Sequence, residues 1–183
     1  MKYYKVLGKD GKPCNGGNGK WFLPKGKRPG KWMPFIEHLR PCVRGYHVCR
    51  QKDLLDWINE TVYLVEIRGK KIIRDDKIVV QQARLIKQMA WNETTARLFA
   101  CDCARRVLSI YEKDRPDDAR PRVAIETAER FARGEATREE MAAAWAAAGA
   151  AAWDAAGAAA RDDESKWQTR RLMQYLTGKR RLL

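Results

Sequence analysis

Thr61-Val62-Tyr63-Leu64-Val65-Glu66-Ile67 is the plainest strand pattern in this chain. Its β-branched and aromatic residues alternate with the period of two that is typical of a β-strand. Two shorter apolar runs follow, Ile72–Ile73 and Ile78–Val80, and each indicates another short strand. This stretch therefore predicts a β-rich region.

The residues upstream of this stretch continue the pattern. Tyr3–Leu7 and Tyr46–Arg50 are further strand candidates, and a hairpin-type turn rich in glycine, residues 8–11, closes the first of them. Between Tyr46–Arg50 and Thr61, residues 51–59 carry leucine, tryptophan and isoleucine at helical spacing. We therefore expect one short helix among the strands.

A long segment between Lys12 and Pro34 has too much glycine and proline for regular structure. Lysines, an arginine and three aromatic residues are interleaved in it. Backbone freedom, cations and exposed rings together suit a surface that follows phosphates and stacks on bases. Alternatively, Trp21 and Trp32 pack against the sheet, which would still leave the lysine side chains outside.

The second half of the chain is predicted to be helical. Asn92 is an N-cap for a helix that runs to about Tyr111, and Pro121 and Gly134 suit the first turn and the end of a second helix. Thr137 and Glu140 form a capping box that opens a third helix. A last short helix is expected over residues 167–176.

The third helix contains an octad repeat, Ala-Ala-Ala-Trp-Ala-Ala-Ala-Gly at 142–149 and Ala-Ala-Ala-Trp-Asp-Ala-Ala-Gly at 150–157. Small residues let a neighbouring helix approach closely, and we expect Trp145 and Trp153 to fill the gaps between helices. Together these patterns predict an α+β protein. A basic β-rich domain with one short helix, residues 1–90, packs on an Ala-rich bundle of three to four helices with a basic tail, residues 91–183.

The charge is strong and uneven. The net charge is +14, and residues 1–89 hold 20 Lys and Arg against 8 Asp and Glu, whereas residues 90–183 hold 17 against 15. A basic surface attracts polyanions and speeds their capture. The candidate residues for contact with nucleic acid or another partner are Lys20, Trp21, Lys25, Lys27, Arg28, Lys31, Trp32, Arg40, Arg44, Arg50, Lys179, Arg180 and Arg181.

No pattern for catalysis or for a cofactor is present. Cys14, Cys42, His47 and Cys49 have metal-ligand chemistry, but no Cys-x-x-Cys spacing joins them, so we predict neither a metal nor a cofactor. His47 and Cys49 are better interpreted as structural groups on a strand. The chain also lacks Walker, Rossmann, zincin and nucleophile-elbow motifs, and we predict that it is not an enzyme.

The location expected from the sequence is the cytoplasm. The chain has five cysteines, an odd number that is typical of reduced thiols and not of a set of disulfides. The opening Met-Lys-Tyr-Tyr-Lys is not followed by the apolar segment that a secretion signal needs. No run of 18 apolar residues is present, so no contact with a membrane is expected.

Two groups of segments resemble known families. Residues 40–50, 64–69 and 75–80 are similar to an uncharacterised domain that recurs in phage and prophage proteins. A helical module found in immunity proteins and phage proteins is similar to residues 97–108 and 120–136 together with the Ala-rich helix. The chain departs from that module in its basic ending, Lys179-Arg180-Arg181.

The resemblance implies a phage-type inhibitor of a host defence system. In size, charge and setting the chain looks similar to the type II anti-CRISPR proteins, which implies a CRISPR effector nuclease and its DNA or guide RNA as partners. An immunity protein that neutralises a toxin through residues 90–164 is one alternative, and a nucleic-acid-modifying enzyme around His47 is another. The oligomeric state, the stoichiometry and any sequence preference stay open.

Overall fold

A computed structural model describes residues 1–148 and 161–179 and confirms an α+β protein. By its contacts the chain divides into a barrel unit, Met1–Trp91 with Leu172–Leu183, and a helical unit, Asn92–Arg171. No helix in the described part of the chain combines the length and the apolar character that crossing a membrane would require.

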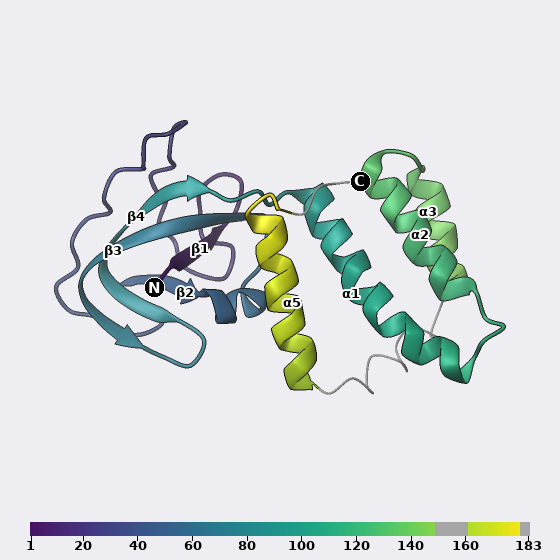
Figure 1. Cartoon of the computed structure of the whole chain (residues 1–183). Helices are drawn as coiled ribbons and strands as arrows, with labels where there is room; N and C mark the ends of the chain where they lie inside the picture. The colour runs from purple at the N-terminus through teal and green to yellow at the C-terminus, as the bar shows by residue number, and fades with distance from the viewer. Residues whose placement is uncertain (149–160, 180–183) are drawn as a thin grey trace. The chain divides into compact units, whose positions relative to one another are not determined.

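The barrel unit is built from four strands that close on themselves (Figure 1). The strands are β1 (Tyr3–Leu7), β2 (Tyr46–Arg50), β3 (Thr61–Ile73) and β4 (Ile78–Gln88). Their order in the sheet is β1-β2-β4-β3, and the pairing of β3 with β1 closes the barrel. Every neighbouring pair is antiparallel. The strand order closes the small sheet on itself, although β2 pairs with β4 only at Ile78–Val80, so the rest of that edge of β4 is left for other partners.

Two long strands replace the three short ones that the sequence predicted. β3 continues through Gly69, where the register of its pairing with β4 shifts between Arg68 and Lys71. Gly69 has a φ of 79°, in the left-handed region that suits glycine at a bulge. The Gln81 side-chain oxygen accepts a hydrogen bond from Lys70 N–H at 2.7 Å, which supplies a partner where the ladder is interrupted.

The glycine- and proline-rich segment lies along the barrel as an irregular strap. Backbone N–H groups of Gly30, Met33 and Ile36 donate to carbonyl groups of alternate β4 residues, at 2.8–3.0 Å. Gly30 has to be glycine because a Cβ there would lie 1.9 Å from the carbonyl oxygen of Phe22. The expected short helix is a 3-10 helix, η1 (Gln51–Asp56).

The barrel core combines residues of the strands and of the strap. Its buried side chains include Leu7, Val48, Ile78 and Leu85 from the strands and Trp21 and Met33 from the strap. The strap is therefore part of the folded unit, although the density of glycine and proline prevents a regular element.

The helical unit contains α1 (Glu93–Asp114), α2 (Arg120–Arg133) and α3 (Arg138–Ala148), and α5 (Arg161–Leu176) begins in it. The ends follow local rules. Asn92 caps α1 by accepting from Thr95 N–H, Gly134 ends α2 with a φ of 79°, and Thr137 and Glu140 cap α3 reciprocally. α5 is longer than the helix predicted over 167–176.

The prediction that Trp145 fills a gap between helices is wrong, because the side chain is 66% exposed. α3 instead turns Met141 and Ala144 inward, and both are partly buried. The other tryptophan of the octad repeat, Trp153, lies outside the described residues.

Candidate functional site

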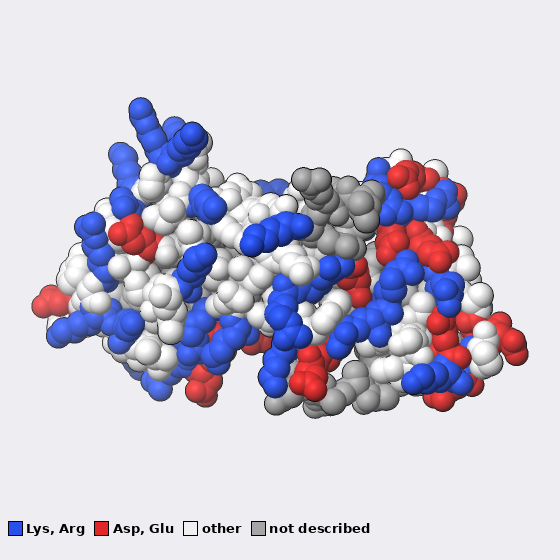
Figure 2. All heavy atoms as spheres, in the orientation of Figure 1, with Lys and Arg blue, Asp and Glu red and all other residues white. Residues whose placement is uncertain are grey.

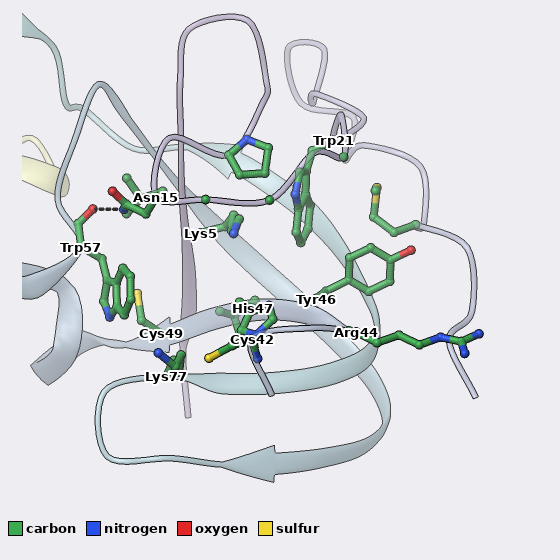
Figure 3. Close-up of a pocket in the computed structure, with 18 of the residues that line it drawn as sticks. Lys5, Asn15, Trp21, Cys42, Arg44, Tyr46, His47, Cys49, Trp57 and Lys77 are labelled. Carbon is green, nitrogen blue, oxygen red and sulfur yellow. Dashed lines mark hydrogen bonds between the residues drawn. The ribbon is translucent and has the colours of Figure 1, made fainter. Parts of the chain in front are cut away.

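A cavity of about 430 Å³ lies in the barrel unit (Figure 3). It is lined by β1 around Lys5, by the strap from Pro13 to Trp21, and by residues 42–49, which lead into and form β2. The lining contains lysine, arginine, histidine, tyrosine and tryptophan side chains but no aspartate or glutamate. The cavity is therefore a cationic, aromatic space of the size that small-molecule sites usually have.

Lys5 is the central cation of this cavity. The period of two along β1 places it on the same face as Tyr3 and Leu7, which both belong to the buried core. Its ammonium nitrogen lies 5.4 Å from the centroid of the Trp21 ring, and within the described residues no ion pair involves it. Burial lowers the pKa of Lys5 to about 8, although the nearby Cys49 and Cys14 act in the opposite direction.

Trp21 and Tyr46 form an aromatic wall beside Lys5. Their rings meet edge to face with centroids 5.5 Å apart, and the Tyr46 hydroxyl donates to the carbonyl oxygen of Pro34 at 2.8 Å. Trp21 is only 4% exposed, and its backbone N–H donates to the carbonyl oxygen of Gly11 at 3.0 Å. The wall is consequently held rigidly from both the strap and β2.

His47 lies on the opposite side of Lys5 from the strap (Figure 3). Its Nε2 accepts a hydrogen bond from the backbone N–H of Cys42 at 2.9 Å, so that nitrogen carries no proton in this arrangement. Burial and the cations Lys5 and Lys77 lower the pKa of His47. The imidazole is therefore neutral near pH 7, and the ring nitrogen that could act as a base is already occupied.

The buried Cys49 thiol is held in its protonated form. The Cys49 thiol lies 3.6 Å from the carbonyl oxygen of Tyr4, to which it donates, and burial together with Asp53 raises the pKa of Cys49 to about 12. A thiol with that pKa stays protonated at neutral pH. In residues 1–148 and 161–179, no three His, Cys, Asp or Glu side chains form a group that could hold a metal ion.

Among the binding residues that the sequence predicted, a set of cations on the strap is exposed. Lys25 and Arg28 close a tight turn through two backbone hydrogen bonds of 3.0 Å, and Gly26 takes a φ of 57° within it. None of these side chains forms an ion pair with a described residue. We call them the strap cations: Lys20, Lys25, Lys27, Arg28 and Lys31.

Arg40 and Arg44 form a second exposed pair. The backbone N–H of Arg40 donates to the carbonyl oxygen of Arg44 at 2.8 Å, which closes a turn at the edge of the unit. Of the two, only Arg44 lines the cavity. On the face of the barrel unit seen in Figure 2, Lys and Arg clearly outnumber Asp and Glu, whereas the two kinds are interspersed over the helical unit.

Three of the predicted binding residues are engaged within the barrel unit. Trp21 belongs to the core, and Trp32 lies against the guanidinium groups of Arg68 and Arg84, whose Cζ atoms are 4.0 and 4.7 Å from its ring centroid. The Arg50 guanidinium binds both carboxylate oxygens of Asp53, at 2.6 and 3.1 Å. The alternative in which Trp21 and Trp32 pack against the sheet is thus the one that the structure adopts.

The predicted basic tail is described only at Lys179. Its side chain is exposed, and its backbone N–H donates to the carbonyl oxygen of Gln174 at 2.9 Å. Arg180 and Arg181 lie outside the described residues.

Arginines of the helical unit are mostly neutralised by acidic partners. The short pairs include Arg105 with Glu129 at 2.9 Å, Arg106 with Glu164 at 2.7 Å and Arg171 with Asp102 at 2.8 Å. Arg120 binds Asp118, which also accepts from the Tyr111 hydroxyl, and these two hydrogen bonds hold the pKa of Asp118 far below its usual range. These cations are consequently less available to phosphates than the strap cations.

Beside Asp118, a hollow lies between α2 and α3. It is lined by the apolar Val123, Ala144 and Ala147 and by the charged Asp117, Asp118 and Arg120. Val123 is 49% exposed, and Trp145 is the other large exposed apolar side chain of the described helical residues. The helical unit thus presents exposed apolar groups within a surface of nearly balanced charge.

Lys5 was missing from the residues that the sequence singled out. The sequence pattern that could have identified it is its position at the centre of a strand, between Tyr3 and Leu7, which lie two residues away on the same face and are apolar. Such a lysine is ordinarily interpreted as an exposed residue. Its position facing the core becomes visible only when the strap covers that face of β1.

The comparison with protein families identifies the helical part of the chain. Residues 90–169 match a family described as "Imm-5 like putative immunity protein", a span that starts just before α1 and reaches into α5. No curated protein and no solved structure matches the chain. The resemblance to immunity proteins is confirmed for this part, whereas the resemblance of residues 40–80 to a phage domain stays a prediction. The chain therefore carries an immunity-protein-like module over residues 90–169.

Proposed function

We propose that the protein is a non-catalytic immunity-type inhibitor, which neutralises a protein toxin by binding it through the helical unit. The observation that carries this proposal is the family match over residues 90–169, because that span takes in α1, α2 and α3. The comparison therefore favours the immunity alternative over an anti-CRISPR protein. A CRISPR effector nuclease as partner rests only on the similarity of setting.

Surface chemistry of the helical unit supports a protein partner. Exposed aromatic side chains are frequent anchors of protein interfaces, and Trp145, at 66% exposure, is such a side chain. Separately, the hollow between α2 and α3 is lined by the half-exposed Val123 together with charged residues such as Asp117. Apolar side chains accompanied by polar ones are the usual composition of a specific interface.

A second candidate function, contact with a polyanion, is favoured by the strap cations. Their positive charges are exposed and have no acidic partner among the described residues, so no internal ion pair has to break when a phosphate binds. Nucleic acid, or a complex that carries it, is the partner that this chemistry would recognise. This function belongs to the barrel unit and is compatible with an immunity role of the helical unit.

The two candidates separate in one experiment. The tagged chain is used to capture partners from a bacterial lysate, with and without nuclease treatment, and each captured protein is rebound in purified form to the wild type and to Trp145→Glu. A direct protein partner survives nuclease treatment and loses affinity for Trp145→Glu. If every partner disappears after nuclease treatment, the polyanion function replaces the immunity function.

A further inference from the structure

The cavity of the barrel unit takes no part in the proposed binding of a toxin. It belongs to residues 1–91, whereas the family match starts at residue 90. Of the cations around it, Lys77 is paired with Asp76 at 3.3 Å and lies 5.0 Å from the centroid of the Trp57 ring. Lys5 has no such counterion, so its charge faces an open space without an acidic residue in the lining.

Keeping an unpaired ammonium on the core face of a strand is costly for a protein. A methionine or leucine at this position would satisfy the alternation of β1 without that cost. A bound anion would compensate the charge of Lys5, and the exposed guanidinium of Arg44 at the same lining would add a second cation. The charges of the cavity therefore select for an anionic ligand.

The rest of the lining selects for a planar ring. Trp21 and Tyr46 form a wall beside Lys5, and Trp57 also lines the cavity. The Asn15 side chain donates to the backbone carbonyl oxygen of Trp57 at 3.0 Å (Figure 3), and the Trp57 indole N–H donates to the carbonyl oxygen of Asp76 at 2.8 Å. Aromatic walls bind flat rings by stacking and by edge-to-face contact. The glycines at 16, 17 and 19 lack side chains, so the backbone of the strap can approach a ligand closely.

We propose that this cavity binds a small organic anion with a planar ring, its anionic group at Lys5 and its ring against Trp21 and Tyr46. A nucleoside 5′-monophosphate has this combination, because a heterocyclic base and a dianionic phosphate are joined by a short sugar. The cavity volume of about 430 Å³ falls within the range of natural small-molecule sites, about 300–1,000 Å³.

The binding also has an expected pH dependence. Lys5 attracts an anion only while it is protonated, and with a pKa of about 8 its charged fraction falls roughly tenfold between pH 7 and pH 9. The titratable groups that line the cavity with it are Cys14 on the strap, Tyr4 on β1, Cys42 before β2, Tyr46, His47 and Cys49 on β2, and the cations Arg44 and Lys77. His47 is already neutral at pH 7, and burial raises the pKa values of Tyr4, Cys14, Tyr46 and Cys49. The loss of binding between pH 7 and pH 9 is therefore assigned to Lys5 by the variant Lys5→Arg, which keeps its charge in this window.

The test is isothermal titration calorimetry on the full chain with the four nucleoside 5′-monophosphates, at concentrations up to about 1 mM. The corresponding nucleosides test the ring alone, inorganic phosphate tests the anion alone, and 4-hydroxybenzoate tests an aromatic carboxylate. We expect at least one ring-bearing anion to bind, with the nucleoside and inorganic phosphate each at least tenfold weaker. The arm that binds identifies the anionic group as a phosphate or a carboxylate.

Variants assign the binding to the cavity. Lys5→Met is expected to weaken binding at least tenfold, and Lys5→Arg is expected to retain it and to lose the fall between pH 7 and pH 9. Lys27→Met removes an exposed strap cation outside the cavity lining and should leave the affinity unchanged. The proposal is overturned if none of the ring-bearing anions binds, or if the wild type and a folded Lys5→Met bind equally. Equal losses in Lys27→Met would also overturn it, because they would assign the binding to the surface.

Discussion

Trp21→Ala tests whether the irregular strap is an integral part of the barrel unit. The Trp21 ring is 4% exposed and belongs to the core, and it packs edge to face on Tyr46 with centroids 5.5 Å apart. Truncating a buried tryptophan costs about 3–5 kcal/mol, to which the lost aromatic pair contributes about 0.5–1.5 kcal/mol. A loss of that size is a large part of the stability of an ordinary domain.

The assay has to report on the barrel unit alone, because a chain with two units need not unfold in one step. Native-state hydrogen exchange of the amides in β3 and β4 does this. We expect their exchange to accelerate by more than about a hundredfold in Trp21→Ala, since each factor of ten corresponds to about 1.4 kcal/mol. If Trp21→Ala fails to fold, Trp21→Phe should show a smaller acceleration of the same amides.

Trp145→Ala is the matched control, because Trp145 is 66% exposed. Removing an exposed side chain away from special contacts usually changes stability by less than about 0.5 kcal/mol. The reasoning would be refuted if Trp21→Ala left the exchange of β3 and β4 within threefold of the wild type. The strap would then be a loosely attached loop, and the aromatic wall of the cavity would not be preformed.

Further predictions concern charge and sterics. The pKa of Lys5 is lowered from its ordinary value of 10.5 to about 8, so the unfolded chain binds more protons than the folded chain between these two pH values. The stability of the wild type relative to Lys5→Met should therefore rise from pH 8 to pH 10.5. Unfolding of both proteins across this range measures the change, and a fall in the relative stability would contradict the prediction. Reversing two exposed strap cations, in the double variant Lys25→Glu with Lys27→Glu, should weaken binding to a short DNA duplex with little change in Tm. The slope of the logarithm of the binding constant against the logarithm of the salt concentration should become shallower by about one to two units. The matched control, Lys113→Glu with Arg138→Glu, should have a much smaller effect, and equal effects would refute a role of the strap. Gly30→Ala should destabilise the barrel unit by more than about 1 kcal/mol, because the new Cβ would lie 1.9 Å from a backbone oxygen that is held in the strap; a neutral result in denaturant unfolding would show that the strap can shift.

The helix ends were predictable because capping is local. Asn92, Gly134 and the Thr137–Glu140 pair each act on backbone groups within a few residues, so the sequence alone locates the ends that they form. Packing between helices is not local. The octad repeat indicated tryptophans between helices, but α3 turns alanine and methionine inward and leaves Trp145 exposed.

β1 and β2 were predicted with their bounds, whereas β3 and β4 were predicted as three short strands. Residues 81–88 begin with two glutamines, and their period of two is carried only by Ala83 and Leu85, so the second half of β4 was missed. The pairing of β1 with both β2 and β3 depends on contacts between distant residues, and no local pattern encodes such closure. The exposed strap cations could be predicted from composition, whereas the position of Lys5 against the buried Trp21 depends on how the strap folds back.

A growth assay tests the central claim, toxin neutralisation through the helical unit, most directly. The captured partner is expressed in a bacterial host with the wild type, with Trp145→Glu, or with Lys25→Glu and Lys27→Glu. We expect the partner alone to stop growth, and the wild type and the strap variant to restore it. Trp145→Glu is expected to fold but not to restore growth. Restoration by Trp145→Glu with failure of the strap variant would rule out neutralisation through the helical unit and would assign the protective surface to the barrel unit.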